Sequence, residues 1–134
     1  MVDISVTAAN VVKGTGAVTQ NGTAGATITA GQSIYLDTVA GTLKLADADV
    51  VASAAAAGIA LHGASLNQPL AYQSAGRITI GGTVVVGTVY VVSITAGGVA
   101  PLADIASGDF VTVLGIGVTT AIIALDIQVS GVAI

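Results

Sequence analysis

The chain has 134 residues, of which 54% are hydrophobic and only 7% charged, and its net charge is −4 at neutral pH. Three Lys and Arg residues are too few to neutralise a phosphate backbone, so we expect no nucleic-acid partner. A chain with no Cys and one His cannot supply a disulfide or a transition-metal site, and its length fits one domain.

The low content of charged residues also indicates that another molecule covers part of the protein surface. A soluble domain carries about 25% charged residues, so much of this exterior must lie against another molecule. The uncharged run 78–103 could span a bilayer as a helix, but its Gly, Val and Thr content and Pro101 favour strands. We therefore expect a subunit interface and no membrane partner.

Residues 1–28 differ from the rest and are rich in Ala, Thr, Gly and Val. Residues 2–7 alternate apolar and polar side chains, the period of a strand, and Asn21-Gly22 is a hairpin signal. Two interpretations stay open: an edge hairpin of the domain, or an extended arm that orders against a neighbouring subunit. The start lacks a basic segment followed by an apolar one, so we expect synthesis in the cytoplasm.

The remainder, residues 29–134, is predicted to be a single β domain made of two pseudo-repeats, about 29–80 and 85–134. Landmarks recur in the same order at a spacing of about 55 residues, which indicates a duplicated unit. The matched segments are 31–36 with 87–92, 41–47 with 98–104, 58–61 with 115–118 and, more weakly, 74–78 with 130–132.

Short runs of β-forming residues separated by glycine predict an all-β fold, a small barrel or sandwich. The expected strands are 33–37, 42–45, 58–61, 70–73, 77–80, 83–86, 90–94, 110–114 and 121–129, with turns at 39–41 and 67–69. One short helix is predicted near 48–57. Asp47 or Asp49 would be its N-cap, and Gly58 would end it in the left-handed conformation.

The residues offer little chemistry, and we expect no enzyme. His62 is the only histidine and no Gly-x-Ser-x-Gly elbow accompanies it. Asp37, Asp47 and Asp49 could offer oxygen ligands to calcium, but the glycine and glutamate of an EF-hand loop are missing, so turn and cap roles are preferred and no metal is expected. The glycine pairs lack the third glycine of a dinucleotide loop, which predicts no cofactor.

Seven segments in this order resemble the small capsid decoration, or cement, proteins of tailed bacteriophages. They are Ala30-Gly31-Gln32-Ser33-Ile34-Tyr35-Leu36, Gly41-Thr42-Leu43-Lys44-Leu45-Ala46-Asp47, Ala57-Gly58-Ile59-Ala60-Leu61, Asn67-Gln68-Pro69, Gly87-Thr88-Val89-Tyr90, Ala96-Gly97-Gly98 and Leu114-Gly115-Ile116-Gly117. The resemblance covers roughly residues 29–118 and departs at Gly117, where alanine would be expected. It implies a non-enzymatic, often trimeric protein on the outer surface of the virion head, where it bridges subunits of the major capsid protein.

For such a role we expect the contacts to come from the N-terminal segment and the apolar sheet edges. Tyr35 and Tyr90 hold equivalent repeat positions, which favours core or interface packing over ligand stacking. The expected interface residues are Val2, Ile4, Val6, Val11, Val12, Val18, Tyr35 and Tyr90. Two alternatives remain. One is a tail or head-fibre module or an adhesin-like surface β domain that binds host glycan, although few aromatic residues are available for it. The other is a small hydrolase, which would need His62.

Overall fold

The all-β fold predicted from the sequence is confirmed by a computed structural model, which describes residues 3–133. Within residues 3–133, ten strands form one antiparallel sheet, accompanied by a single α-helical turn and two 3-10 turns. The strands are β1 (Val12–Lys13), β2 (Val18–Thr23), β3 (Ser33–Asp37), β4 (Thr42–Leu45), β5 (Ala56–Ala60), β6 (Pro69–Thr79), β7 (Val89–Val92), β8 (Val99–Pro101), β9 (Phe110–Gly117) and β10 (Ile122–Ala133), with α1 (Val51–Ala54), η1 (Ala8–Asn10) and η2 (Leu102–Asp104).

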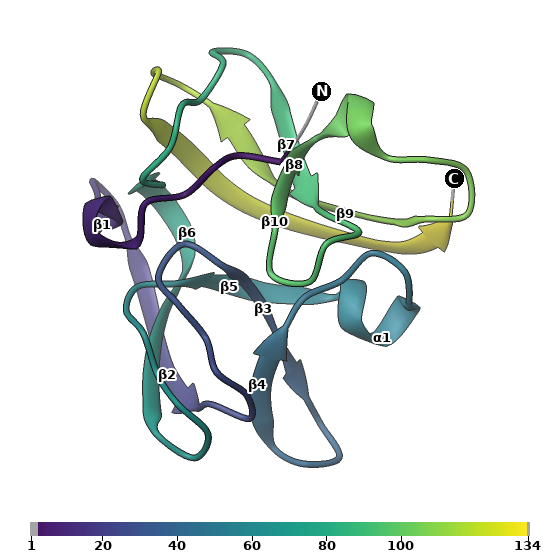
Figure 1. Cartoon of the computed structure of the whole chain (residues 1–134). Coiled ribbons are helices and arrows are strands. Elements are labelled where there is room, and N and C mark those ends of the chain that lie inside the picture. Colours follow the sequence, from purple (N-terminus) through teal and green to yellow (C-terminus); the bar gives the residue numbers. More distant parts are fainter. Residues whose placement is uncertain (1–2, 134) are drawn as a thin grey trace.

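The strands follow the order β4-β3-β5-β6-β10-β9-β7-β8, and β1 and β2 pair with β6 outside this path. The first half of the chain thus contributes β4-β3-β5-β6, and the second half contributes its counterparts in the same order, β8-β7-β9-β10. Figure 1 shows the two halves one above the other, each strongly curled. In the first half, a parallel bridge between Ala24 and Leu43 brings the end of β2 against β4.

The strand registers identify which residues of the two halves correspond. Ile34 lies opposite Gly58 in the first half, as Tyr90 lies opposite Gly115 in the second. The segments 31–36 and 87–92 therefore correspond as aligned in the sequence, but Tyr90 is the counterpart of Ile34. The prediction that Tyr35 and Tyr90 are equivalent is wrong by one residue, and one residue reverses the face of a strand.

Two other details of the repeat differ from the sequence alignment. Leu43 pairs with Leu36 as Val99 pairs with Val92, so the counterpart of Gly41 is Gly97 and not Gly98. Both of these glycines have positive φ, 72° and 79°. The weakest match, 74–78 with 130–132, does not correspond in the structure, because the β9–β10 connection is shorter than the β5–β6 connection.

The N-terminal segment contains no Asn-Gly hairpin. Asn21 and Gly22 lie inside β2, opposite Ala71 and Leu70 of β6, because pairing with this long strand extends the chain through them. Residues 3–7 are assigned to no strand. They still pack on their own domain, where the Ile4 N–H donates to the Val99 carbonyl at 2.9 Å and the Thr7 N–H to the Gly81 carbonyl at 2.8 Å.

The helix is shorter than predicted. It begins after Val50, whose side chain caps nothing, while Asp47 Oδ1 accepts the Asp49 N–H at 2.9 Å in the turn before it. The helix ends because Ala56 must pair with Tyr35 of β3, so Gly58 lies within β5 and ends no helix. Tertiary pairing has here overridden the helix propensity of the alanine run.

The remaining differences concern strand limits. The predicted strands 70–73 and 77–80 are one strand, β6, which continues through Gly76 at a φ of 87°. Residues 83–86 form no strand. The turns at Gly41 and Asn67 are confirmed, each with positive φ.

Two apolar clusters fill the interior. One lies in the first half and contains Ala24, Ile28, Ile34, Leu43, Ala60, Ala64 and Leu70. The larger one extends through the second half and includes Ile59, Ile78, Ile80, Tyr90, Val92, Leu114 and Ile123. Because nearly all of these side chains are aliphatic, the strands approach closely, and several glycines mark the points of closest approach.

Candidate interaction surfaces

The structure separates the eight predicted interface residues into three groups. Val12 and Val18 are exposed, at 56% and 47%, on the edge strands β1 and β2, as an interface would require. Ile4, Val6 and Tyr35 are half-buried and pack against the larger core cluster. Val11 and Tyr90 are core residues, and Val2 lies outside the described residues.

Tyr90 is buried for a specific reason. Only 2% of it is exposed, and its hydroxyl accepts the Val85 N–H at 2.9 Å. It lies opposite Gly115 in the pairing of β7 with β9, and its side chain belongs to the larger core cluster. Tyr90 therefore belongs to the core and is unavailable as an interface residue.

The start of the described chain is also held to its own domain. Both oxygens of the Asp3 carboxylate lie 2.8 Å from the Ser93 hydroxyl, and Ser93 accepts the Ala48 N–H through its carbonyl oxygen. The apolar side chains of Ile4 and Val6 pack on the core. Residues 3–7 thus have partners within this chain.

A set of exposed apolar side chains that the sequence patterns did not indicate lies around α1. We define the α1 surface as Val50, Val51, Val129 and Val132, which are between 47% and 65% exposed. Two contacts bring these elements together. Thr112, opposite Val129, donates its hydroxyl to the Ala54 carbonyl, and the Phe110 N–H donates to the Ala48 carbonyl.

A second set, which we define as the β7–β9 surface, consists of Val85, Val86 and Ile116, each about half exposed. Ile116 lies opposite Val89 of β7, and the Gly87 N–H donates to the Gly117 carbonyl next to it. The sequence pattern predicted a strand over 83–86, which includes Val85 and Val86. No strand forms there, and both side chains reach solvent.

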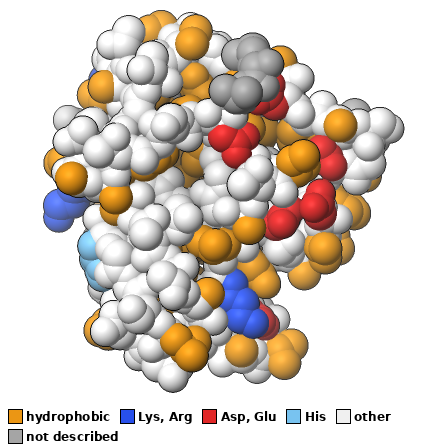
Figure 2. All heavy atoms as spheres, viewed as in Figure 1, with side chains coloured by type: hydrophobic (Ala, Val, Ile, Leu, Met, Phe, Trp, Pro, Cys, Tyr) orange, Lys and Arg blue, Asp and Glu red, His pale blue; other side chains and the backbone are white. Residues whose placement is uncertain are grey.

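The charges are unevenly placed. Contacts through Ser93 and Ala48 connect Asp3 to the loop that carries Asp47 and Asp49, while Asp109 adjoins Phe110 and Asp104 lines a hollow together with Asp3. Figure 2 shows most of the visible carboxylates on the side of the molecule that carries α1. In residues 3–133 no three His or Asp side chains converge as metal ligands would.

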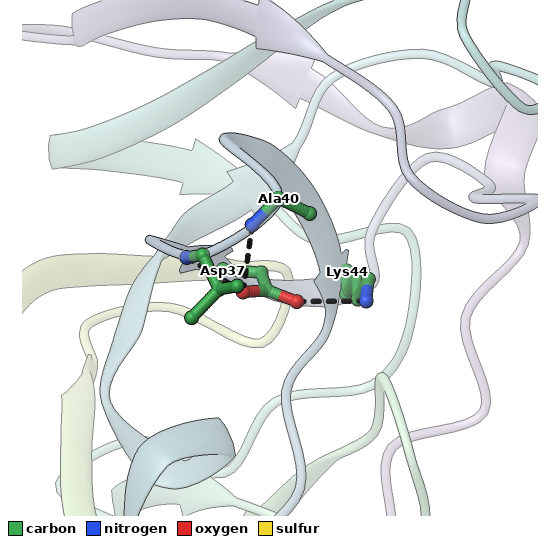
Figure 3. Close-up of polar contacts among 4 residues, drawn as sticks. Asp37, Ala40 and Lys44 are labelled. Atoms are coloured by element: carbon green, nitrogen blue, oxygen red, sulfur yellow. Dashed lines mark hydrogen bonds and ion pairs between the residues drawn. The ribbon is translucent and has the colours of Figure 1, made fainter.

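Asp37 and Lys44 form an ion pair in the β3–β4 hairpin (Figure 3). The Lys44 ammonium donates to Asp37 Oδ2 at 2.7 Å, and Asp37 Oδ1 accepts the N–H groups of Val39 and Ala40. The Lys44 hydrogen bond, followed by the two backbone N–H groups, lowers the pKa of Asp37 below 3.8, and Asp37 raises the pKa of Lys44 above 10.5. Asp37 thus acts as a turn residue, held by two backbone N–H groups and by Lys44.

We expect this pair to give the hairpin a pH dependence. A carboxylate with a lowered pKa stabilises the fold above its unfolded pKa, and this contribution disappears as the pH falls below about 4. The Asp37→Asn variant should lose less of its melting temperature than the wild type as the pH is lowered through this range. The matched control is Asp49→Asn, an exposed aspartate before α1, which should follow the wild type. Identical acid profiles for the wild type and Asp37→Asn would contradict the expectation.

Both ring nitrogens of His62 bind backbone groups. Nε2 accepts the Ala71 N–H at 3.0 Å, so Nδ1 carries the proton and donates to the Gly63 carbonyl at 2.9 Å. In this arrangement the imidazole links the 62–68 loop to the start of β6. It has no free nitrogen to act as a general base.

Comparison with known proteins adds no relative. No protein-family model matches the chain, and no curated protein is similar to it in sequence. Among the described residues, no helix is long and apolar enough to cross a membrane.

Proposed function

We propose that the chain is a structural protein of a tailed bacteriophage, which binds the outer surface of the head and stabilises it by bridging subunits of the major capsid protein. The observation that carries the proposal is the exposure of apolar side chains in a chain of which only 7% of the residues are charged. The α1 surface and the β7–β9 surface, together with Val12 and Val18, leave valine and isoleucine side chains about half exposed. The choice of the major capsid protein as the partner rests on the resemblance of residues 29–118 to decoration proteins.

In this role the protein stabilises the head by adhesion, that is, by burying apolar surface against the capsid subunits. Burying apolar surface against the shell yields about 25 cal/mol per Å², less the free energy lost in ordering the two partners. A ligand that binds only the assembled shell also shifts the equilibrium away from disassembly. A protein of this kind needs no catalytic group, and its specificity lies in shape.

The glycan-binding alternative has weaker support. Sugar sites commonly present an exposed aromatic face, whereas here Tyr90 is buried and Tyr35, Tyr72 and Phe110 are half-buried. We therefore do not pursue it as a second function.

The test is binding to heads. Expanded, DNA-free heads assembled from the major capsid protein of the encoding phage, without this chain, should retain the purified protein on sedimentation at a fixed ratio to capsid subunits. Their thermal disassembly should shift to higher temperature. Recovery of the chain only in the supernatant would overturn the proposal.

The same assay locates the contact. Val51→Asp places a charge on the α1 surface and Val86→Asp places one on the β7–β9 surface, each on a half-exposed side chain. Whichever surface meets the shell should lose binding by about tenfold or more per buried charge, while the other variant serves as its control.

A further inference from the structure

Among the described residues, four strands of the sheet pair on one side only, β1, β2, β4 and β8, and the chain covers the outer edges of β4 and β8. The outer edge of β4 is met by the segment after β2, where the Gly25 N–H donates to the Leu43 carbonyl at 2.7 Å. The outer edge of β8 is met by the N-terminal segment, where the Ile4 N–H donates to the Val99 carbonyl at 2.9 Å. Leu43 and Val99 are counterparts in the two halves, so equivalent backbone hydrogen bonds cover the outer edges of β4 and β8.

The outer edge of β2 is open. Ala71, opposite Asn21, directs its own N–H to His62 and its carbonyl to the Leu61 N–H, away from β2. Asn21 therefore also points its N–H and carbonyl away from β6, and by strand alternation so does Thr19. Among the described residues, nothing outside β6 pairs with positions 18–22.

Nothing in the composition of β2 protects this edge. Natural edge strands are usually shielded by a charge, a proline, a strong bulge or short length. The sequence Val18-Thr19-Gln20-Asn21-Gly22-Thr23 has no charge and no proline, and its only irregularity lies between Val18 and Thr19. Five of the six residues are exposed, so both faces of the strand reach solvent as well as its edge.

We propose that the open edge of β2 binds β2 of a second copy of this chain, antiparallel, across a two-fold axis. With Gln20 of the two copies facing each other on the axis, Thr19 of one copy lies opposite Asn21 of the other. The outward N–H and carbonyl groups then pair in both directions. This isologous contact closes at two copies, in place of the trimer that the resemblance implies.

The placement of charge favours a second copy as the occupant. Each chain carries a net charge of −4, so two copies repel unless their carboxylates are kept apart. Asp47, Asp49 and Asp109 lie around α1, on the side of the molecule opposite β2 (Figure 1). Contact through β2 keeps these carboxylates of the two copies apart and also covers the exposed Val18.

Light scattering of the purified full chain tests the proposal. We expect twice the chain mass of 12.8 kDa for the wild type. Asn21→Pro removes an N–H that points away from β6 and leaves the hydrogen bonds to β6 in place. Gln20→Lys brings two like charges together on the two-fold axis. Both variants should have half the mass of the wild type and an unchanged circular dichroism spectrum. Thr38→Lys adds the same charge in the exposed β3–β4 turn and should remain dimeric.

Three results would overturn the proposal: a monomeric wild type, a wild type of any other mass, or a dimer that survives both β2 variants. The contact does not depend on the decoration role, because it is measured on the isolated chain. Failure to bind phage heads would leave the dimer result standing, and the reverse also holds.

Discussion

Replacing Gly58 or Gly115 by alanine should destabilise the protein by about 3 kcal/mol or more, and the double variant should not fold. The two glycines occupy the same position in the two halves, on β5 and β9. A Cβ at Gly58 would lie inside van der Waals distance of the Gln73 carbonyl, and one at Gly115 would meet the Ala124 carbonyl in the same way. These are backbone atoms of the paired strand, which can move away only if the sheet opens.

The measurement is the free energy of unfolding in urea. Gly63→Ala is the matched control, since its Cβ would lie 3.6 Å from the nearest atom, the Ile28 carbonyl oxygen, and should change stability by less than about 1 kcal/mol. Gly108→Ala is a second control in open space, where only the positive φ of 96° is strained. If Gly58→Ala and Gly115→Ala matched Gly63→Ala, the close strand contact described here would be wrong.

These glycines also show how much of the fold could be predicted from the sequence. Because glycine and β-branched residues act locally, the all-β class and the bounds of β3 and β4 were predicted correctly. The recurrence of Gly58 at Gly115 was visible as well, because a close strand contact restricts both positions to glycine. What the recurrence could not reveal was the correspondence between β6 and β10, since the connection between strands had changed length.

The errors arose where a long-range partner decides local structure. Asn21-Gly22 has the composition of a hairpin turn, but six paired residues of β6 extend it. The alanine run after Val50 has helix propensity, but β3 takes its second half into the sheet. Neither partner can be identified from residues nearby in the sequence.

The candidate surfaces were predicted only in part, for the same reason. Val12 and Val18, which were expected at an interface only as part of the N-terminal segment, are exposed on the edge strands β1 and β2. Val11, adjacent to Val12, faces the core instead. The α1 surface joins residues that are distant in the sequence, Val50 and Val132 among them, and it appears only when β9 and β10 are placed against the helix.

Tyr90 provides the other large expected effect, and it separates a core role from an interface role. Tyr90→Ala should cost about 3–5 kcal/mol, because it removes a fully buried aromatic side chain from the larger cluster. Tyr90→Phe keeps the ring and leaves the Val85 N–H without its acceptor, which should cost about 1–2 kcal/mol.

Tyr35→Ala is the comparison, since this side chain is only half-buried and should cost less than half as much. Urea unfolding of the three variants gives the ranking. An interface residue would behave differently: its truncation would leave the isolated chain stable and weaken only binding to heads. If Tyr90→Ala were as stable as the wild type, Tyr90 would be an interface residue after all, and the register of β7 described here would be wrong. The expected ranking, with Tyr90→Ala the most destabilised, would show that Tyr90 is a central core residue of the second half. Its counterpart Ile34 lies in the core cluster of the first half.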